Sequence, residues 1–100
     1  MSPPLHVSLD QVATFCDKWG ISQFSLIGSA LRSDFGPGSD VDVVVTFGAD
    51  TKWDLFDIVT MREELAAMYG RPVDLIEEPA VRNPYMLESI RRTKRVLYAA

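Results

Sequence analysis

The first regular pattern along the chain is a helical one. Between residues 9 and 19, apolar side chains recur every three or four positions, a spacing that places them on one face of a helix. Ser8 stands three residues before Gln11, as in a capping box, and Gly20 is suitably placed to end the helix. The pattern therefore predicts a helix over residues 9–19, with Cys16 packed in the core.

A longer helical pattern follows in the second half of the chain. We expect this helix to begin at a cap on Asp50 or Thr51 and to run through Tyr69, because Gly70 suits the position after the last turn and Pro72 prevents continuation. Apolar spacing predicts one inward-facing stripe, with a single arginine in it. Its members are Leu55, Ile58, Val59, Arg62, Leu65, Ala66 and Tyr69.

Three short apolar segments predict strands, at residues 24–27, 41–47 and 73–76. The middle segment is β-branched almost throughout and apolar at successive positions. Such a strand is usually covered on both faces, so we expect it to lie in the centre of the sheet. The segments are short, and a helix separates the second from the third, which indicates a small sheet.

The C-terminal region predicts one more helix, because Asn83 and Pro84 fit its cap and first position. Residues 96–98 fit either the end of that helix or a short edge strand. The order of elements predicts an α/β fold on a small mixed sheet. A chain of 100 residues, 47% of them hydrophobic, has the size and composition of one globular domain, here residues 1–100.

The amino-acid composition excludes or argues against several kinds of catalytic and metal-binding site. One cysteine and one histidine exclude an internal disulfide and argue against a Cys/His zinc site or a Cys–His nucleophile pair. No apolar run reaches the roughly 18 residues of a membrane span, and the N-terminus lacks the features of a signal peptide. We therefore expect a cytoplasmic protein without membrane contact, whose chemistry rests mainly on carboxylates.

Charge is distributed unevenly along the chain. Residues 1–80 hold five basic and thirteen acidic residues, a net charge of −8, whereas residues 81–100 hold five basic residues and one acidic residue, a net charge of +4. The acidic body argues against nucleic-acid binding. The basic end could meet phosphate, RNA or an acidic protein surface, or it is a solvated helix end whose cations suit the helix dipole. Its members are Arg82, Arg91, Arg92, Lys94 and Arg95.

Three aspartates occupy positions that otherwise belong to a core. Asp40 and Asp42 stand two apart at the start of a predicted strand, so both face the same side, and Asp74 lies in the next predicted strand. If these strands meet, three carboxylates converge, and burying them unpaired costs several kcal/mol. Arg32 offers one counter-charge, which leaves a deficit. Oxygen ligands of this kind suit Mg²⁺.

Gly28 and Ser29 follow the first predicted strand and have the features of a phosphate site. Glycine allows close approach of a ligand to the backbone. The N–H groups of Ser29 and Ala30 would lie at the mouth of a short helix, where anions bind readily, and the Ser29 hydroxyl could add a hydrogen bond. Taken alone, either this pair or the two aspartates is a weak signal.

The combination is more specific. Along the chain it consists of a strand, Gly28-Ser29, ten further residues, Asp40-Val41-Asp42, an apolar strand, a helix and a third acid at Asp74. This order resembles that of the nucleotidyltransferase superfamily with the DNA polymerase beta-like fold. The short chain and the position of Arg32 resemble its minimal nucleotidyltransferases, the MNT (MntA-like) proteins. Nothing in the chain resembles the additional nucleotide-binding domain of larger relatives.

This resemblance implies roles for six residues. Gly28, Ser29 and Arg32 would bind the nucleotide, and three aspartates would be both catalytic residues and metal ligands: Asp40, Asp42 and Asp74. Two Mg²⁺ ions and ATP as substrate are implied, with transfer of AMP to a hydroxyl. Small MNT proteins commonly act as antitoxins of HEPN-domain ribonucleases, and some adenylylate a tyrosine of that partner. The alternatives are an antitoxin that acts by binding alone and a small-molecule nucleotidyltransferase.

Overall fold

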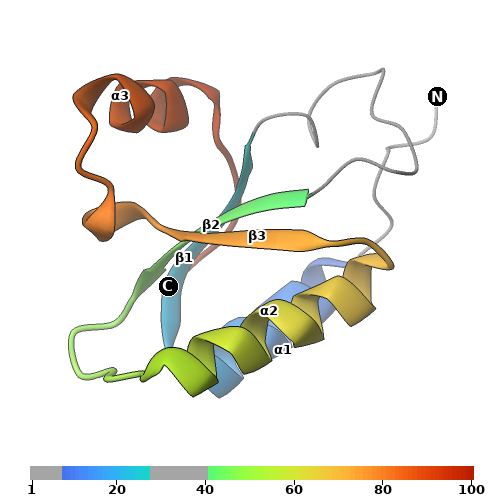
Figure 1. The fold of residues 1–100 in the computed structure, drawn as a ribbon. Helices are drawn as coiled ribbons and strands as arrows, with labels where there is room; N and C mark the ends of the chain where they lie inside the picture. Colours follow the sequence, from blue (N-terminus) through green and yellow to red (C-terminus); the bar gives the residue numbers. More distant parts are fainter. Residues whose placement is uncertain (1–7, 28–40) are drawn as a thin grey trace, which may run out of the picture.

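The computed structural model describes residues 8–27 and 41–100, which form a four-stranded sheet with helices on both faces (Figure 1). This arrangement confirms the predicted α/β class with a small mixed sheet. The elements in chain order are α1 (Leu9–Trp19), β1 (Ile21–Ile27), β2 (Val41–Phe47), α2 (Leu55–Tyr69), β3 (Val73–Glu77), the 3-10 turn η2 (Glu78–Ala80), α3 (Pro84–Thr93) and β4 (Arg95–Ala99).

The sheet has the strand order β3-β2-β1-β4. β2 and β3 run parallel and are joined through α2, whereas β1 is antiparallel to both of its neighbours. β2 therefore lies inside the sheet, as its apolar sequence predicted. The open question about residues 96–98 is also decided, because they belong to the edge strand β4.

Helix α1 begins and ends where the sequence predicted. The Ser8 hydroxyl accepts the Gln11 N–H, and the Gln11 side chain accepts the Ser8 N–H, each at 3.1 Å. Gly20 follows the helix with φ 67°, a left-handed conformation that glycine adopts at little cost. A side chain at Gly20 would also collide with Thr51, so this turn requires glycine on two grounds.

Helix α2 begins later than predicted. Its cap is Asp54, which accepts the N–H of Asp57 at 2.9 Å while the Asp57 side chain accepts the N–H of Asp54 at 3.1 Å. Thr51 is engaged elsewhere, since its hydroxyl donates to the carbonyl of Gly48 at 2.7 Å. The expected cap at Asp50 or Thr51 is therefore wrong, because a reciprocal pair three residues downstream satisfies the first turn instead.

The main core lies between the sheet and the two helices α1 and α2, which cover the same face (Figure 1). Alternate residues of β2 are fully buried there. The burial of Cys16 confirms its predicted place in this core and raises the pKa of its thiol to about 12. The buried members are Val12, Phe15, Cys16, Trp19, Ile21, Phe24, Leu26, Val41, Val43, Val45, Met61, Leu65 and Val73.

The inward face of α2 differs in part from the predicted stripe. Met61 and Leu65 are fully buried. Leu55, in the first turn, is 75% exposed, and Arg62 is exposed as well. The side chains that face the core are those of Ile58, Met61 and Leu65, at positions i, i+3 and i+7. The first turn of the helix lies beyond the core that these side chains contact.

Candidate active site

Asp42 and Asp74 occupy neighbouring positions on adjacent strands. β2 and β3 are parallel, and their register pairs Asp42 with Asp74. Val41 and Val43, on either side of Asp42, belong to the core under α1 and α2, so Asp42 faces the opposite side of the sheet. Asp42 is partly buried and Asp74 is exposed. Two predicted site carboxylates therefore share one face, on strands about 4.8 Å apart.

The remaining predicted site residues adjoin this pair in sequence. Ile27, the last residue of β1, pairs with Asp42, so β1, β2 and β3 contribute Ile27, Asp42 and Asp74 to one row across the sheet. Gly28 and Ser29 follow Ile27 in the chain, and Asp40 precedes Val41. Four predicted residues lie outside the described residues: Gly28, Ser29, Arg32 and Asp40.

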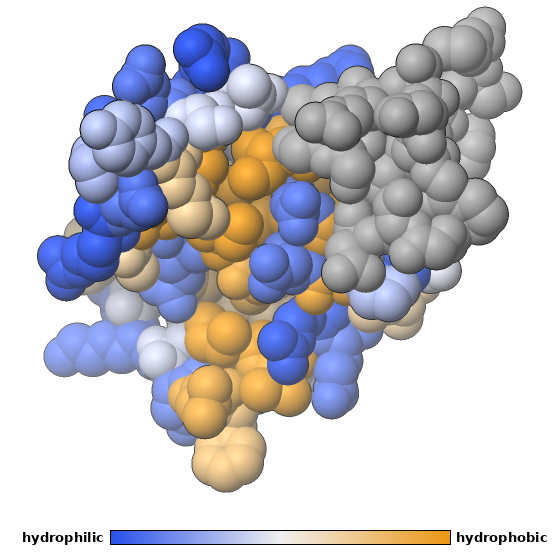
Figure 2. Space-filling model, turned by 45° about the horizontal axis from the view of Figure 1, so that its top comes forward, coloured by the Kyte–Doolittle hydropathy of each residue, from blue (hydrophilic) through white to orange (hydrophobic). Residues whose placement is uncertain are grey.

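The next row on the same face is mostly apolar and largely buried. Ser25 pairs with Val44, which pairs with Ile76, and Ser25 and Val44 are 1% and 2% exposed. Among the described residues, the Ser25 hydroxyl has no hydrogen-bond partner. Ile90 of α3, also on this side of the sheet, is buried too. Figure 2 shows hydrophobic side chains gathered in the middle of this face.

The potential metal ligands that the strands bring together here are carboxylates. Within residues 8–27 and 41–100, no group of three or more His, Cys, Asp or Glu side chains is arranged to hold a metal ion. The described part of the site is thus a pair, Asp42 and Asp74. Its donor chemistry fits a hard divalent cation, because two carboxylates on neighbouring strands repel each other unless positive charge lies near them.

Lys94 has a structural role that the sequence analysis missed. Its Nζ lies 2.8 Å from Glu78 Oε1 and donates to Gln23 Oε1 at 2.7 Å, and its side chain is only 16% exposed. Lys94 therefore joins the α3–β4 corner to η2 and β1 and does not belong to a solvated basic end. No local sequence pattern could have shown this role of Lys94, because Gln23 is 71 residues away along the chain.

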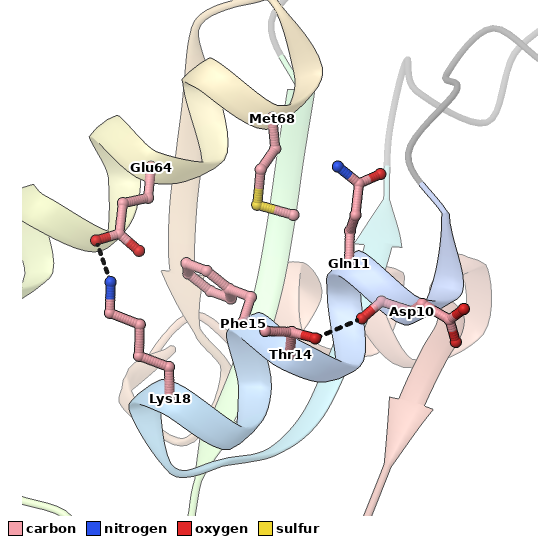
Figure 3. Close-up of a pocket in the computed structure, with 7 residues that line it drawn as sticks. All are labelled: Asp10, Gln11, Thr14, Phe15, Lys18, Glu64 and Met68. Carbon is pink, nitrogen blue, oxygen red and sulfur yellow. Dashed lines mark hydrogen bonds and ion pairs between the residues drawn. The ribbon is translucent and has the colours of Figure 1, made fainter.

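A groove of about 420 Å³ lies between α1 and α2, away from the two aspartates (Figure 3). Lys18 and Glu64 close one end with an ion pair of 2.8 Å. Burial acts to raise the pKa of Glu64, but hydrogen bonds from Lys18 and Trp19 and the charge of Lys18 outweigh it and hold that pKa below its ordinary value. None of the predicted site residues lines this groove.

Residues 10–97 match the model of the nucleotidyltransferase domain. The chain belongs to that family. It is also 31% identical, over 74 residues and 74% of each chain, to a protein of Methanocaldococcus jannaschii named "Putative protein adenylyltransferase MJ1379". These matches confirm the predicted enzyme class, a nucleotidyltransferase.

Solved structures agree on the fold. A chain of the "Crystal structure of the toxin-antitoxin with AMP-PNP" superposes with a TM-score of 0.76 at 17% identity, covering 94% of this chain and 75% of that one. A chain from the complex of a tri-AMPylated Shewanella oneidensis HEPN toxin with its MNT antitoxin has a TM-score of 0.65 at 16% identity, covering 92% and 70%. At such identities the likeness establishes the fold.

In the described part of the chain, every helix is too short or too polar to cross a membrane.

Proposed function

We propose that this nucleotidyltransferase transfers AMP from ATP to a hydroxyl group of a partner protein and acts as the antitoxin of a HEPN toxin. The observation that carries the proposal is the β2–β3 register, which sets Asp42 beside Asp74 on the sheet face away from α1 and α2. The name of the M. jannaschii relative favours a protein acceptor. The AMPylated toxin in a similar complex favours a HEPN partner.

Asp40, Asp42 and Asp74 would hold the metal. Asp42 and Asp74 supply two carboxylates from adjacent strands, and Asp40 stands two residues before Asp42. Bound as a pair, Mg²⁺ ions supply positive charge at both the attacking and the leaving oxygen. Gly28 and Ser29 would bind the triphosphate through backbone N–H groups and a hydroxyl, with Arg32 adding a cation.

The reaction is a displacement at the α-phosphorus of ATP. A bond forms between the acceptor oxygen and the α-phosphorus, the bond from that phosphorus to the β-phosphate oxygen breaks, and pyrophosphate leaves. Asp74 would take the proton of the attacking hydroxyl, because it is exposed at the row that also holds Asp42. We propose a tyrosine side chain as acceptor, since its phenolic oxygen is acidic enough to lose that proton readily.

Mass spectrometry of the partner tests the proposal. The wild-type chain, incubated with Mg²⁺, ATP and the proposed HEPN partner, should add whole AMP units to one tyrosine of that protein. Asp74→Asn should abolish the addition. Glu77→Gln is the matched control, because Glu77 is also an exposed acid of β3 but pairs with Val45, on the other face of the sheet.

Three results would contradict the proposal in different ways. A partner that is neutralised without any gain in mass would mean that the chain acts by binding alone. A full rate with Asp74→Asn would remove Asp74 from the site. AMP addition to a small hydroxylated molecule, with the partner unmodified, would favour a small-molecule nucleotidyltransferase.

A further inference from the structure

The first turn of α2 presents large apolar side chains to solvent. Leu55 is 75% exposed and Phe56 is 81% exposed, and Trp53, just before the helix, is 37% exposed. Single apolar residues are common on protein surfaces, but a contiguous group usually marks a contact with another molecule. We call Trp53, Leu55 and Phe56 the apolar knob. Figure 2 shows hydrophobic side chains gathered at the lower end of the molecule, where α2 begins in Figure 1.

The apolar knob is held in place by contacts of its own segment. The Trp53 indole N–H donates to the carbonyl of Trp19 at 2.9 Å, and the two indole rings meet edge to face with their centroids 5.2 Å apart. The reciprocal hydrogen bonds of Asp54 and Asp57 fix the first turn of the helix. Because its backbone is fixed in advance, the apolar knob loses little main-chain freedom on binding, which favours association.

A cleft of about 420 Å³ lies next to the apolar knob. Trp53 belongs to both, because its side chain also lines the cleft. Other parts of the wall come from the last residues of two strands, Phe47 of β2 and Glu77 of β3, and from Pro79. Clefts of about 300–1,000 Å³ hold small-molecule ligands, so this cleft has room for an aromatic side chain.

Side chains of opposite charge line the cleft. Lys52 stands beside the apolar knob in the chain, and Glu77 lies on the wall formed by β3. Both are exposed, and the two ion pairs found among the described residues are made by other side chains. The cleft therefore offers one positive and one negative group to whatever enters it.

We propose that two copies of this chain form a dimer in which the apolar knob of each copy enters the cleft of the other. In a two-fold contact one surface patch meets itself, so the patch must present both a protrusion and a hollow, and charges of both signs. The apolar knob and the adjoining cleft meet both conditions. Lys52 of each copy then lies against Glu77 of the other, which gives the contact two ion pairs.

The proposed contact leaves the candidate active site open. Phe47 packs against the core, and Glu77 pairs with Val45 of that core, so both lie on the sheet face under α1 and α2. Asp42 and Asp74 lie on the other face. From Asp42 to Phe47, β2 also rises by about 17 Å. Each site of the dimer stays accessible, so dimerisation and the proposed function can be tested separately.

Sedimentation equilibrium of the chain alone tests the proposal. The patch is smaller than the roughly 20–30 residues a side of a standard interface, so we expect a weak dimer with a Kd on the order of 10 μM. Phe56→Ser should weaken it at least about tenfold. Tyr85→Ser is the matched control, because Tyr85 is 82% exposed in the first turn of α3, and it should dimerise like wild type. Circular dichroism checks that both variants keep the fold.

Charge reversal tests the two-fold arrangement. Lys52→Glu or Glu77→Lys places like charges across the contact and should weaken each homodimer about tenfold. An equimolar mixture of the two variants should dimerise again, because one copy then carries two acidic groups where the other carries two basic ones. Native mass spectrometry, with one variant isotopically labelled, identifies this heterodimer.

Three results would overturn the proposal. A wild-type chain that stays monomeric well above the expected Kd would remove the second copy as occupant, and weaker binding of Phe56→Ser to the proposed HEPN partner would then assign the patch to that protein. Equal behaviour of Phe56→Ser and Tyr85→Ser would place the contact elsewhere. A mixture of the charge variants that is no more dimeric than either variant alone would exclude the two-fold arrangement.

Discussion

The two faces of the sheet are built from alternate residues of the same strands, yet they differ in composition. On the face under α1 and α2, β2 contributes Val41, Val43 and Val45, all fully buried. On the other face the same strand contributes Asp42, Val44 and Thr46, and only Val44 is buried. One face is a continuous apolar core, whereas the other is apolar in its middle and acidic at one end.

The difference shows how a small domain can carry an acidic site. Asp42 and Asp74 cost little where they are, because Asp74 is exposed and Asp42 is partly so. Core packing on the opposite face holds their strands in register, and the residue next to each carboxylate, Val41 or Val73, contributes to that packing. Stability and chemistry should therefore be separable by mutation, one face at a time.

The largest expected effect is on the acidic face. Asp42→Asn should reduce AMP transfer by a factor of at least about 10², because the amide has nearly the shape of the carboxylate but not the charge that a divalent cation requires. Far-UV circular dichroism should show an unchanged fold. The rate is measured by mass spectrometry of the partner, with Thr46→Val, on the same face of the same strand, as control. Near-native transfer would remove Asp42 from the metal site.

Mutations on the opposite face, under α1 and α2, should change the free energy of unfolding rather than the activity. Leu65→Ala removes a fully buried side chain and should cost about 2–5 kcal/mol of unfolding free energy, lowering the thermal midpoint by roughly 10 °C or more. Transfer per folded molecule should stay at the wild-type rate. Urea unfolding and the transfer assay, both at a temperature well below the midpoint, measure the two quantities. A stable but inactive variant would show that the faces are coupled.

A smaller effect should follow from Lys94→Met. This change leaves Glu78 poorly exposed and without its cation, which should cost about 1–3 kcal/mol. The double variant Lys94→Met/Glu78→Gln should regain most of that loss. Lys18→Met breaks a more exposed ion pair with Glu64 and should cost at most about 1 kcal/mol. Equal costs for the two single variants would contradict the anchoring role of Lys94.

The smallest effect concerns alkaline pH. Burial raises the pKa of Cys16 and of Tyr69 to about 12, from ordinary values of 9.0 and 10.0. The folded state therefore holds these protons more tightly than the unfolded state does. This contribution to stability is complete below about pH 9 and is lost as the pH rises toward 12. Urea unfolding across that range should show the decline.

Two variants sharpen the pH measurement. Tyr69→Phe and Cys16→Ala should each flatten the alkaline decline. Tyr69→Phe should cost little at neutral pH, because the Tyr69 hydroxyl is buried and has no hydrogen-bond partner within residues 8–27 and 41–100. An unchanged decline in the double variant would assign the pH dependence to other groups.

Local patterns in the sequence were enough to predict most of the secondary structure. The capping box at Ser8, the glycines at 20 and 70 and the Asn83-Pro84 start of α3 each act within a few residues, and all four are present in the structure. The cap of α2 was wrong because Asp50, Thr51 and Asp54 all have suitable side chains. The reciprocal hydrogen bonds between Asp54 and Asp57 make Asp54 the cap, while the Thr51 hydroxyl donates to the carbonyl of Gly48.

For the site, the sequence indicated the residue types and their spacing. The alternation of β2 sets which face Asp42 occupies, because a strand sends successive side chains to opposite sides. That Asp42 lies opposite Asp74 depends on the register between strands that are separated by all of α2. The roles of Gly28, Ser29, Arg32 and Asp40 remain predictions.

Sequence alone thus determined what depends on neighbours along the chain: the three helices with most of their ends, three of the four strands, the α/β class and the acidic residues in apolar strands. The tertiary structure decided what depends on residues far apart. It made residues 95–99 an edge strand beside β1, it paired Lys94 with Glu78 and Gln23, and it set Arg95 opposite Leu26 at the end of β1. The physical reason is that a pairing between distant strands is selected by the packing of the whole sheet, which no local pattern encodes.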